Sequence, residues 1–218
     1  MKLFLIRHGN TFNAGETPVR VGANEDLPLT EEGEAQARRL GAAMKAAGID
    51  PAAAVTGPLR RTRRHLEIVL EEMNASPPVA VDERLREIDY GAWGGLSDEE
   101  IGRRFGPKAA AELEAWNRDS RWPRETVTWR PDPATIARNA AALTAELAGR
   151  LKPEDCALIC SSNGILRYFL EITAKKMAAV GDHGKAKMKT GALSLLDVRD
   201  TGTQVVFWNL PAGSPLPA

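Results

Sequence analysis

The stretch KLFLIRHG at residues 2–9 is the starting point for interpreting the whole chain. Residues 2–7 form a short apolar run, followed by His8 and Gly9, which predicts a buried strand ending at Arg7 and His8. Rigid scaffolds present catalytic groups on the loops that follow such elements. The run is too short for a signal peptide, because Arg7 and His8 interrupt it before the usual ~7–15 apolar residues.

Beyond this strand, apolar runs alternate with segments of helical periodicity. Residues 10–29 are rich in Asn, Gly, Pro and Asp and predict a long loop, which in a compact domain usually serves function. The expected strands are 52–56, 79–81, 156–160, 192–198 and 203–208, and the expected helices are 31–47, 58–73, 97–104, 108–118, 134–151 and 165–177. This alternation predicts an α/β fold, a three-layer sandwich with a mostly parallel central sheet and helices on both faces.

Length and composition indicate an ordinary globular protein. We expect one domain over residues 1–210, with a helical insert at about 97–135 and a flexible Pro- and Gly-rich tail at 211–218. Lys plus Arg and Asp plus Glu both number 29, so no global field draws the chain to nucleic acid or to a membrane. No stretch is apolar enough to span a membrane, and Cys156 and Cys160 are interpreted as buried thiols, so we expect a cytoplasmic protein.

The chain has three histidines, of which His8 is the best candidate for chemistry. A neutral imidazole is a competent nucleophile, and covalent catalysis divides one hard displacement into two easier ones. His65 lies in a predicted amphipathic helix beside arginines, and we expect it on a solvated face. His183 lies in a Gly-flanked loop, where a surface role and a lid role both stay open.

Phosphoryl groups need positioning and charge neutralisation, which the planar fork of arginine provides. Arg7 and either Arg60 or Arg61, which follows the second strand, can converge on a bound phosphate. Residues 161–164, Ser-Ser-Asn-Gly, follow the late strand. In parallel sheets ligands bind beyond the carboxyl ends of the strands, where these groups are expected.

Five blocks of the sequence resemble the histidine phosphatase superfamily, the group that includes phosphoglycerate mutases. The blocks, in order, are LFLIRHGNTFN at 3–13, DLPLTEEGEAQARRL at 26–40, TGPLRRTRRHLEIV at 56–69, RLREIDYGAWGGLSDEEI at 84–101 and CALICSSNGILRY at 156–168. The resemblance is weakest over about residues 105–155. It implies a phosphoglycerate mutase-like fold and a phosphohistidine mechanism.

Carried over to this sequence, the resemblance implies a role for each matching residue. His8 would attack phosphorus, Arg7 and Arg61 would hold the phosphoryl oxygens, and Glu87 would protonate the leaving oxygen and then activate water. Residues that would line the phosphate pocket are Thr11, Asn13 and Asn163. The resemblance implies neither a metal nor an organic cofactor.

Asn163 departs from the family pattern, which usually has a second histidine in this turn. Its amide can still donate a hydrogen bond, although it carries no positive charge. A hydrogen bond to a charged partner is worth about 1.5–3 kcal/mol, and the phosphoryl oxygens are anionic, so part of the benefit survives. We therefore expect reduced or retuned activity rather than none.

These observations favour a phosphatase for a small phosphorylated metabolite. A mutase, which returns the phosphoryl group to substrate, and a catalytically weak module that binds phosphorylated ligands stay open as alternatives. We expect no nucleic-acid or membrane partner. A homodimer stays open, since the sequence does not set the oligomeric state.

Overall fold

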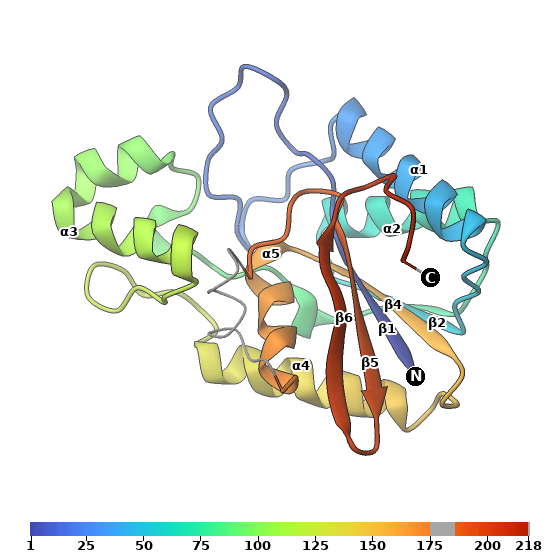
Figure 1. Cartoon of the computed structure of the whole chain (residues 1–218). Coiled ribbons are helices and arrows are strands. Elements are labelled where there is room, and N and C mark those ends of the chain that lie inside the picture. Colours follow the sequence, from blue (N-terminus) through green and yellow to red (C-terminus); the bar gives the residue numbers. More distant parts are fainter. Residues whose placement is uncertain (175–185, 218) are drawn as a thin grey trace.

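Figure 1 shows the computed structural model, which describes residues 1–174 and 186–217. Its strands form a six-stranded sheet in the order β3-β2-β4-β1-β5-β6. The strands are β1 Lys2–Arg7, β2 Ala53–Thr56, β3 Val79–Val81, β4 Cys156–Ser161, β5 Leu193–Arg199 and β6 Gly202–Leu210. The neighbours β3, β2, β4 and β1 pair in parallel, whereas β5 and β6 pair antiparallel at the other edge.

The strand β1 lies inside the sheet, between β4 and β5. Its register with β4 runs from Lys2 opposite Cys156 to Arg7 opposite Ser161. Both strands therefore end at the same height, and the His8 amide continues the ladder by donating to the Ser161 carbonyl, with N and O 3.2 Å apart. This pairing brings together, at the carboxyl ends of β1 and β4, two segments about 150 residues apart in sequence.

Helices cover both faces of the sheet, which confirms the predicted three-layer sandwich (Figure 1). The helices are α1 Glu31–Ala46, α2 Arg60–Met73, α3 Asp98–Asp119, α4 Pro133–Ala148 and α5 Asn163–Leu166, with the short 3-10 segments η1 Glu83–Leu85, η2 Gly91–Trp93 and η3 Arg167–Ile172. Alternation along β1 places Leu3 and Leu5 in the core on the α4 side, and Phe4 and Ile6 in the core under α1 and α2.

The helix starts follow the predicted capping residues. Thr30 caps α1 by accepting from the Gly33 amide at 3.1 Å, and Ser97 with Glu100 forms a complete capping box on α3. The two helices expected at 97–104 and 108–118 adjoin within α3, where Gly106 breaks the helical backbone with φ +83° just before Pro107. Thus α3 lies within residues 97–135, where a helical insert stays a prediction.

Two expected helices differ from the structure. Pro58 was expected in the first helical turn, but α2 starts at Arg60 with Leu59 as N-cap. The helix expected at 165–177 is α-helical only over Asn163–Leu166 and continues as the 3-10 segment η3 to Ile172. Residues 167–170 are all buried, so this segment is a connector through the core and not an amphipathic surface helix. Residues 175–177 lie outside the described part of the chain.

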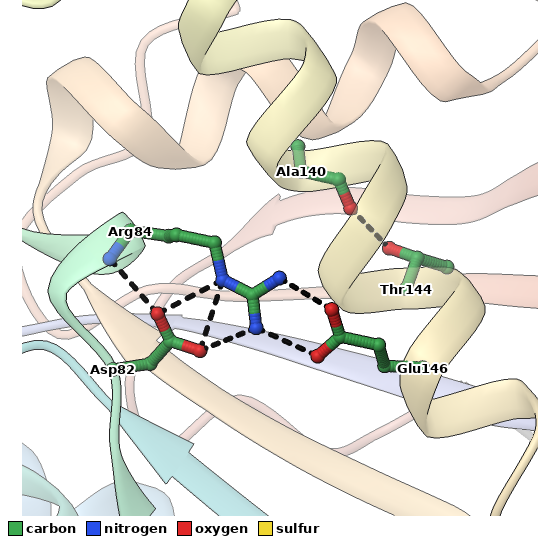
Figure 2. A network of polar contacts seen from close by, with 5 residues as sticks. All are labelled: Asp82, Arg84, Ala140, Thr144 and Glu146. Carbon is green, nitrogen blue, oxygen red and sulfur yellow. Dashed lines mark hydrogen bonds and ion pairs between the residues drawn. The ribbon is translucent and has the colours of Figure 1, made fainter.

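An ion-pair network fixes the segment that leads into the candidate acid Glu87. The Arg84 guanidinium, on η1, binds both Asp82 and Glu146, the latter on α4 (Figure 2). The two carboxylates raise the pKa of Arg84 above its ordinary value. Such partly exposed pairs add little stability, about 0–1 kcal/mol each, but they tie η1 to α4. The carbonyl of the next residue, Leu85, accepts from the Ser161 hydroxyl at 2.7 Å, which joins η1 to the end of β4.

Candidate active site

His8 lies at the end of β1 and is only 6% exposed. Its Nδ1 is 2.8 Å from the Gly9 carbonyl oxygen, and a carbonyl only accepts, so Nδ1 carries the proton. The lone pair is therefore on Nε2, which accepts from Arg61 Nε at 3.2 Å. Burial, followed by the charges of Arg61 and Arg7, holds the pKa of His8 well below its ordinary value. The imidazole is thus neutral, in the tautomer that a nucleophilic Nε2 requires.

Gly9 allows the His8 loop to pack directly on the start of α1. A Cβ at Gly9 would lie 2.3 Å from the Gly33 carbonyl oxygen, so only glycine fits there. The same residue binds His8 through its carbonyl, as described above. The glycine of the His-Gly pair therefore holds both the loop and the imidazole.

Arg61 is fully buried at the start of α2, whereas Arg60 is exposed. This answers the question left open by the sequence, since Arg61 and not Arg60 reaches His8. Its terminal nitrogens donate to the carbonyls of Glu25 at 2.8 Å and Gly22 at 3.1 Å. The loop over residues 10–29 thus fixes the guanidinium beside the imidazole.

Arg7 also lines the site, and part of its guanidinium is free to bind a ligand. Its Nη1 donates to the Met188 carbonyl, while its buried Nε makes no hydrogen bond within the described part of the chain. Burial lowers the pKa of Arg7, and the charge of Glu87 partly offsets this. A buried donor without a partner costs about 1–3 kcal/mol, which an anionic ligand at this position would remove.

Glu87 is buried and fixed through both carboxylate oxygens. Oε1 accepts from the Ile88 amide at 2.8 Å, and Oε2 accepts from the Gly164 amide at 3.0 Å. A Cβ at Gly164 would lie 2.2 Å from Oε1, so glycine after Asn163 is required for this approach. The turn after β4 therefore positions the acid that follows η1.

Asn163, the first residue of α5, lines the same cavity. Its Oδ1 accepts from the Met188 amide at 2.9 Å, and the Met188 carbonyl accepts from Arg7, so one peptide segment holds both side chains. With Oδ1 occupied, the amide nitrogen Nδ2 is the group available to a ligand, and it makes no hydrogen bond to any residue that the structure describes.

The cavity has a volume of about 560 Å³. Thr11 and Asn13 line its outer part on the loop, and the Asn13 amide donates to Glu16 at 3.0 Å. Six of the seven residues proposed from sequence line this cavity: Arg7, His8, Thr11, Asn13, Glu87 and Asn163. The seventh, the buried Arg61, contacts the lining residue His8. The structure therefore brings the proposed set together. His183 lies outside the described residues.

The expectation for His65 was wrong, because the residue is fully buried and not solvated. Its Nδ1 accepts from the Gly9 amide at 3.0 Å, and its Nε2 has no partner among the described residues. The signal was present in the sequence, since His65 lies on the stripe of α2 that contains Thr62, Leu66 and Val69. The side chain supports the loop that carries His8.

We expect His65 to make the protein less stable in acid. Burial lowers its pKa to about 3, so below about pH 6.5 the unfolded chain binds a proton that the folded chain rejects. Stability then falls as pH decreases, by up to about 1.4 kcal/mol per pH unit for this proton. Asparagine accepts a hydrogen bond but does not titrate. Urea unfolding should therefore show His65→Asn losing roughly 2–3 kcal/mol less than wild type between pH 6.5 and 4.5. Equal losses would contradict this.

Sequence reasoning missed three further cations that line the cavity, Arg20, Arg167 and Lys187. Arg20 and Lys187 lie outside the five blocks, whereas Arg167 lies within the block at 156–168 but was given no role there. Within the described ranges, no group of three or more His, Cys, Asp or Glu could hold a metal ion. The same residues include no helix with the length and apolar character needed to cross a membrane.

The architecture matches phosphoglycerate mutase-like α/β proteins. The native structure of a mycobacterial glucosyl-3-phosphoglycerate phosphatase superposes with a TM-score of 0.76 at 22% identity, over 97% of this chain and 99% of that one. At this identity the likeness establishes the fold, which the resemblance of the five sequence blocks had implied.

The chain belongs to the histidine phosphatase superfamily, branch 1, whose family model matches residues 3–211. A 2,3-bisphosphoglycerate-dependent phosphoglycerate mutase from a Caulobacter species is 30% identical over 98% of this chain and 87% of its own length. The mutase of the same description from Corynebacterium diphtheriae is 38% identical over 54% of this chain, and that match spans only 46% of the relative. The superfamily thus includes both phosphatases and mutases, and its members act on small phosphorylated substrates.

Proposed function

We propose that this protein is a phosphomonoester phosphatase that acts through a phosphohistidine intermediate. The observation that carries the proposal is the neutral imidazole of His8, whose Nε2 lone pair faces the Arg61 guanidinium at 3.2 Å. A nucleophile and a fixed cation at that separation suit an entering phosphoryl group, which needs positioning and charge neutralisation more than covalent help.

In the first step, His8 Nε2 attacks phosphorus, and the ester P–O bond breaks as the P–N bond forms. Arg61 and the unpartnered Nε of Arg7 bind the equatorial oxygens, and Asn163 Nδ2 donates a further hydrogen bond. Glu87 gives its proton to the leaving alcohol oxygen. In the second step, a water attacks phosphorus, Glu87 takes the proton of that water, and the P–N bond breaks to release phosphate.

Solvent access supports water as the final acceptor. Residues 13–18 of the loop are exposed, and several of them form the rim of the cavity. Water can therefore reach the phosphohistidine from this side. The two relatives reported above are described as mutases, so transfer to a second hydroxyl is the alternative that they favour. A module that only binds phosphorylated ligands is the third candidate, because the family resemblance implies Asn163 where a second histidine is usual.

The test is a panel of phosphorylated metabolites incubated in water enriched in oxygen-18, with the His8→Ala protein as control. A phosphatase releases inorganic phosphate that carries one heavy oxygen from solvent. A mutase instead moves the unlabelled phosphoryl group to another hydroxyl of the substrate or cofactor. Transfer without labelled phosphate would replace the phosphatase proposal with the mutase. Binding without either product would leave the binding module.

We expect Asn163 to act as a neutral donor to the phosphoryl oxygens. Asn163→Leu should weaken phosphate binding about 10- to 100-fold at every pH, since it removes a hydrogen bond to a charged partner. Asn163→Asp keeps an acceptor for the Met188 amide but replaces the donor with an anion, so it should bind phosphate more weakly still. Asn163→His should bind more tightly only where the new imidazole is protonated. Inhibition by inorganic phosphate, measured against pH, checks all three. Parent-like binding by Asn163→Leu would place Asn163 outside the site.

A further inference from the structure

Three cations in the cavity have no part in the mechanism above. They are Arg20 from the loop over 10–29, Arg167 from η3 and Lys187 from the segment that precedes β5. The charges of Arg7 and Arg61, which take part in the mechanism, are partly compensated by the Glu87 carboxylate nearby. The charge of these three residues therefore needs a separate explanation.

Arg167 is only 1% exposed and stacks over the Trp116 ring, with its guanidinium carbon 3.9 Å from the ring centroid. Its hydrogen bonds go to neutral groups, the Ser120 hydroxyl at 2.8 Å and the Asn163 carbonyl at 3.3 Å. No described carboxylate forms a salt bridge with it, and Nη2 makes no hydrogen bond within the described ranges. A buried cation is costly unless it is paired, so this environment favours the binding of an anion.

Arg20 and Lys187 extend this cationic surface. Arg20 shares its Nη2 between Asp98 at 2.8 Å and Asn117 at 3.0 Å, while its buried Nε has no partner in the described part of the chain. Lys187 lines the cavity with an exposed side chain and forms no salt bridge to a described carboxylate. Partial desolvation, together with the charges of Arg7, Arg20 and Arg167, lowers its pKa. The charge of Asp98, whose side chain is 60% exposed, opposes this effect. Arg20 pairs with the partly solvated Asp98, and Arg167 lies in the field of Glu87 without forming a salt bridge to a described carboxylate.

The remaining acids of the cavity wall have partners of their own. Glu16 accepts from Asn13, and Glu32 accepts from Arg39 outside the cavity. They lie on the loop and on α1, whereas Arg167 and Arg20 contact the C-terminal half of α3 at Trp116 and Asn117. The cationic surface is therefore not neutralised by these two acids.

We propose that the substrate carries a second anionic group, which binds Arg20, Arg167 and Lys187 while its phosphoryl group faces His8. This inference rests on the proposed function, because it concerns the substrate of the same cavity. Two guanidinium groups and an ammonium group suit an oxyanion with several acceptor oxygens, either a carboxylate or a second phosphate. Phosphate esters of neutral alcohols would leave this surface unpaired.

Binding of non-hydrolysable phosphonates tests the inference without requiring turnover. Three series of increasing chain length are compared: alkylphosphonates, the matching ω-carboxyalkylphosphonates and the matching bisphosphonates. The stacking of Arg167 on Trp116 makes tryptophan fluorescence a suitable signal, with calorimetry as the second measurement. The series separate a carboxylate from a phosphate as the second group, and chain length reports the spacing between the two subsites.

We expect one chain length at which a phosphonate with a second anionic group binds about 10- to 100-fold more tightly than the alkylphosphonate of the same length. Lys187→Gln should reduce this preference about three- to fivefold, and Lys187→Glu should remove it. Both should have little effect on the binding of the simple alkylphosphonates. The matched controls Lys189→Gln and Lys189→Glu change an exposed lysine that does not line the cavity, and they should keep the preference.

A preference below twofold at every chain length would overturn the inference. So would equal effects of the Lys187 and Lys189 variants. Hydrolysis of simple alkyl phosphates is measured separately with the wild-type protein. If these esters are hydrolysed and no anionic preference appears, the phosphatase proposal stands and the second subsite fails. If the preference appears and the protein hydrolyses no phosphate ester, neither the alkyl phosphates nor the metabolite panel, the subsite stands and the phosphatase proposal fails.

Discussion

We expect the His8→Ala protein to lose phosphatase turnover by about 10⁴-fold or more while it keeps its fold. Nε2 of His8 is the group that forms the bond to phosphorus, and neither Arg61 nor Arg7 can replace it as nucleophile. Removing a covalent nucleophile typically leaves only the catalysis that comes from binding and charge neutralisation. Phosphate release from the best ester of the panel, with enzyme concentration varied over a wide range, measures the loss.

The matched control is Lys189→Gln, which changes an exposed residue outside the cavity and should keep full turnover. Circular dichroism and urea unfolding establish that the His8→Ala protein is folded. Because the His8 side chain is neutral and makes two hydrogen bonds to the described residues, its truncation should cost about 1–3 kcal/mol of stability. Turnover within tenfold of wild type by the folded variant would exclude His8 as the nucleophile.

The second large effect is expected from Glu87→Gln, which should slow hydrolysis of alkyl phosphates by about 10²–10⁴-fold. An alkoxide is a poor leaving group and needs the proton that Glu87 supplies. An aryl phosphate with an activated leaving group needs that proton less, so the burst that reports phosphorylation should be slowed far less. Rapid-quench measurement of the burst on both esters separates this step from hydrolysis of the intermediate.

The environment of Glu87 makes the leaving-group comparison necessary. Both carboxylate oxygens accept backbone N–H groups, from Ile88 and Gly164, and a glutamine would turn its own NH₂ group toward one of them. The substitution therefore also costs about 1–3 kcal/mol of local fit, which affects all substrates alike. A loss in burst rate that is equal for alkyl and aryl esters would assign Glu87 a positioning role only.

The position of much of the site could be predicted, because the sequence indicates where the buried strands end. Residues 2–7 and 156–160 are apolar runs that stop at polar residues, and parallel strands place such ends at one edge of a sheet. Asn163 therefore meets Glu87 and Arg7 although all three are far apart in sequence. The family resemblance added the role of Glu87, for which position alone gives no signal.

The prediction of a solvated His65 was wrong because it followed the adjacent residues in sequence and not the face of the helix on which His65 lies. Arg63 and Arg64 precede it and suggest a solvated face, yet His65 is one turn after Arg61 and points the same way. Both side chains then contact the His8 segment, Arg61 at the imidazole and His65 at the Gly9 amide. Counting in steps of three and four along α2 would have placed both residues in the core.

The cations of the second subsite could not be predicted, because tertiary packing alone brings them together. Arg20 comes from an irregular loop, and Lys187 comes from a segment without regular structure. Arg167 follows a very short helix and is held by Trp116 and Ser120, both from the end of α3. No local periodicity connects these three elements.

The most direct test of the central claim is to trap the phosphoryl group on the protein. The enzyme is mixed with a labelled phosphomonoester, quenched within the burst, and divided between acid and base before peptide mapping. A phosphohistidine is a phosphoramidate, so the label should survive base, be lost in acid, and map to the peptide that contains His8. The His8→Ala protein should carry no label. Turnover without any base-stable adduct, or an adduct on a residue other than His8, would contradict the account.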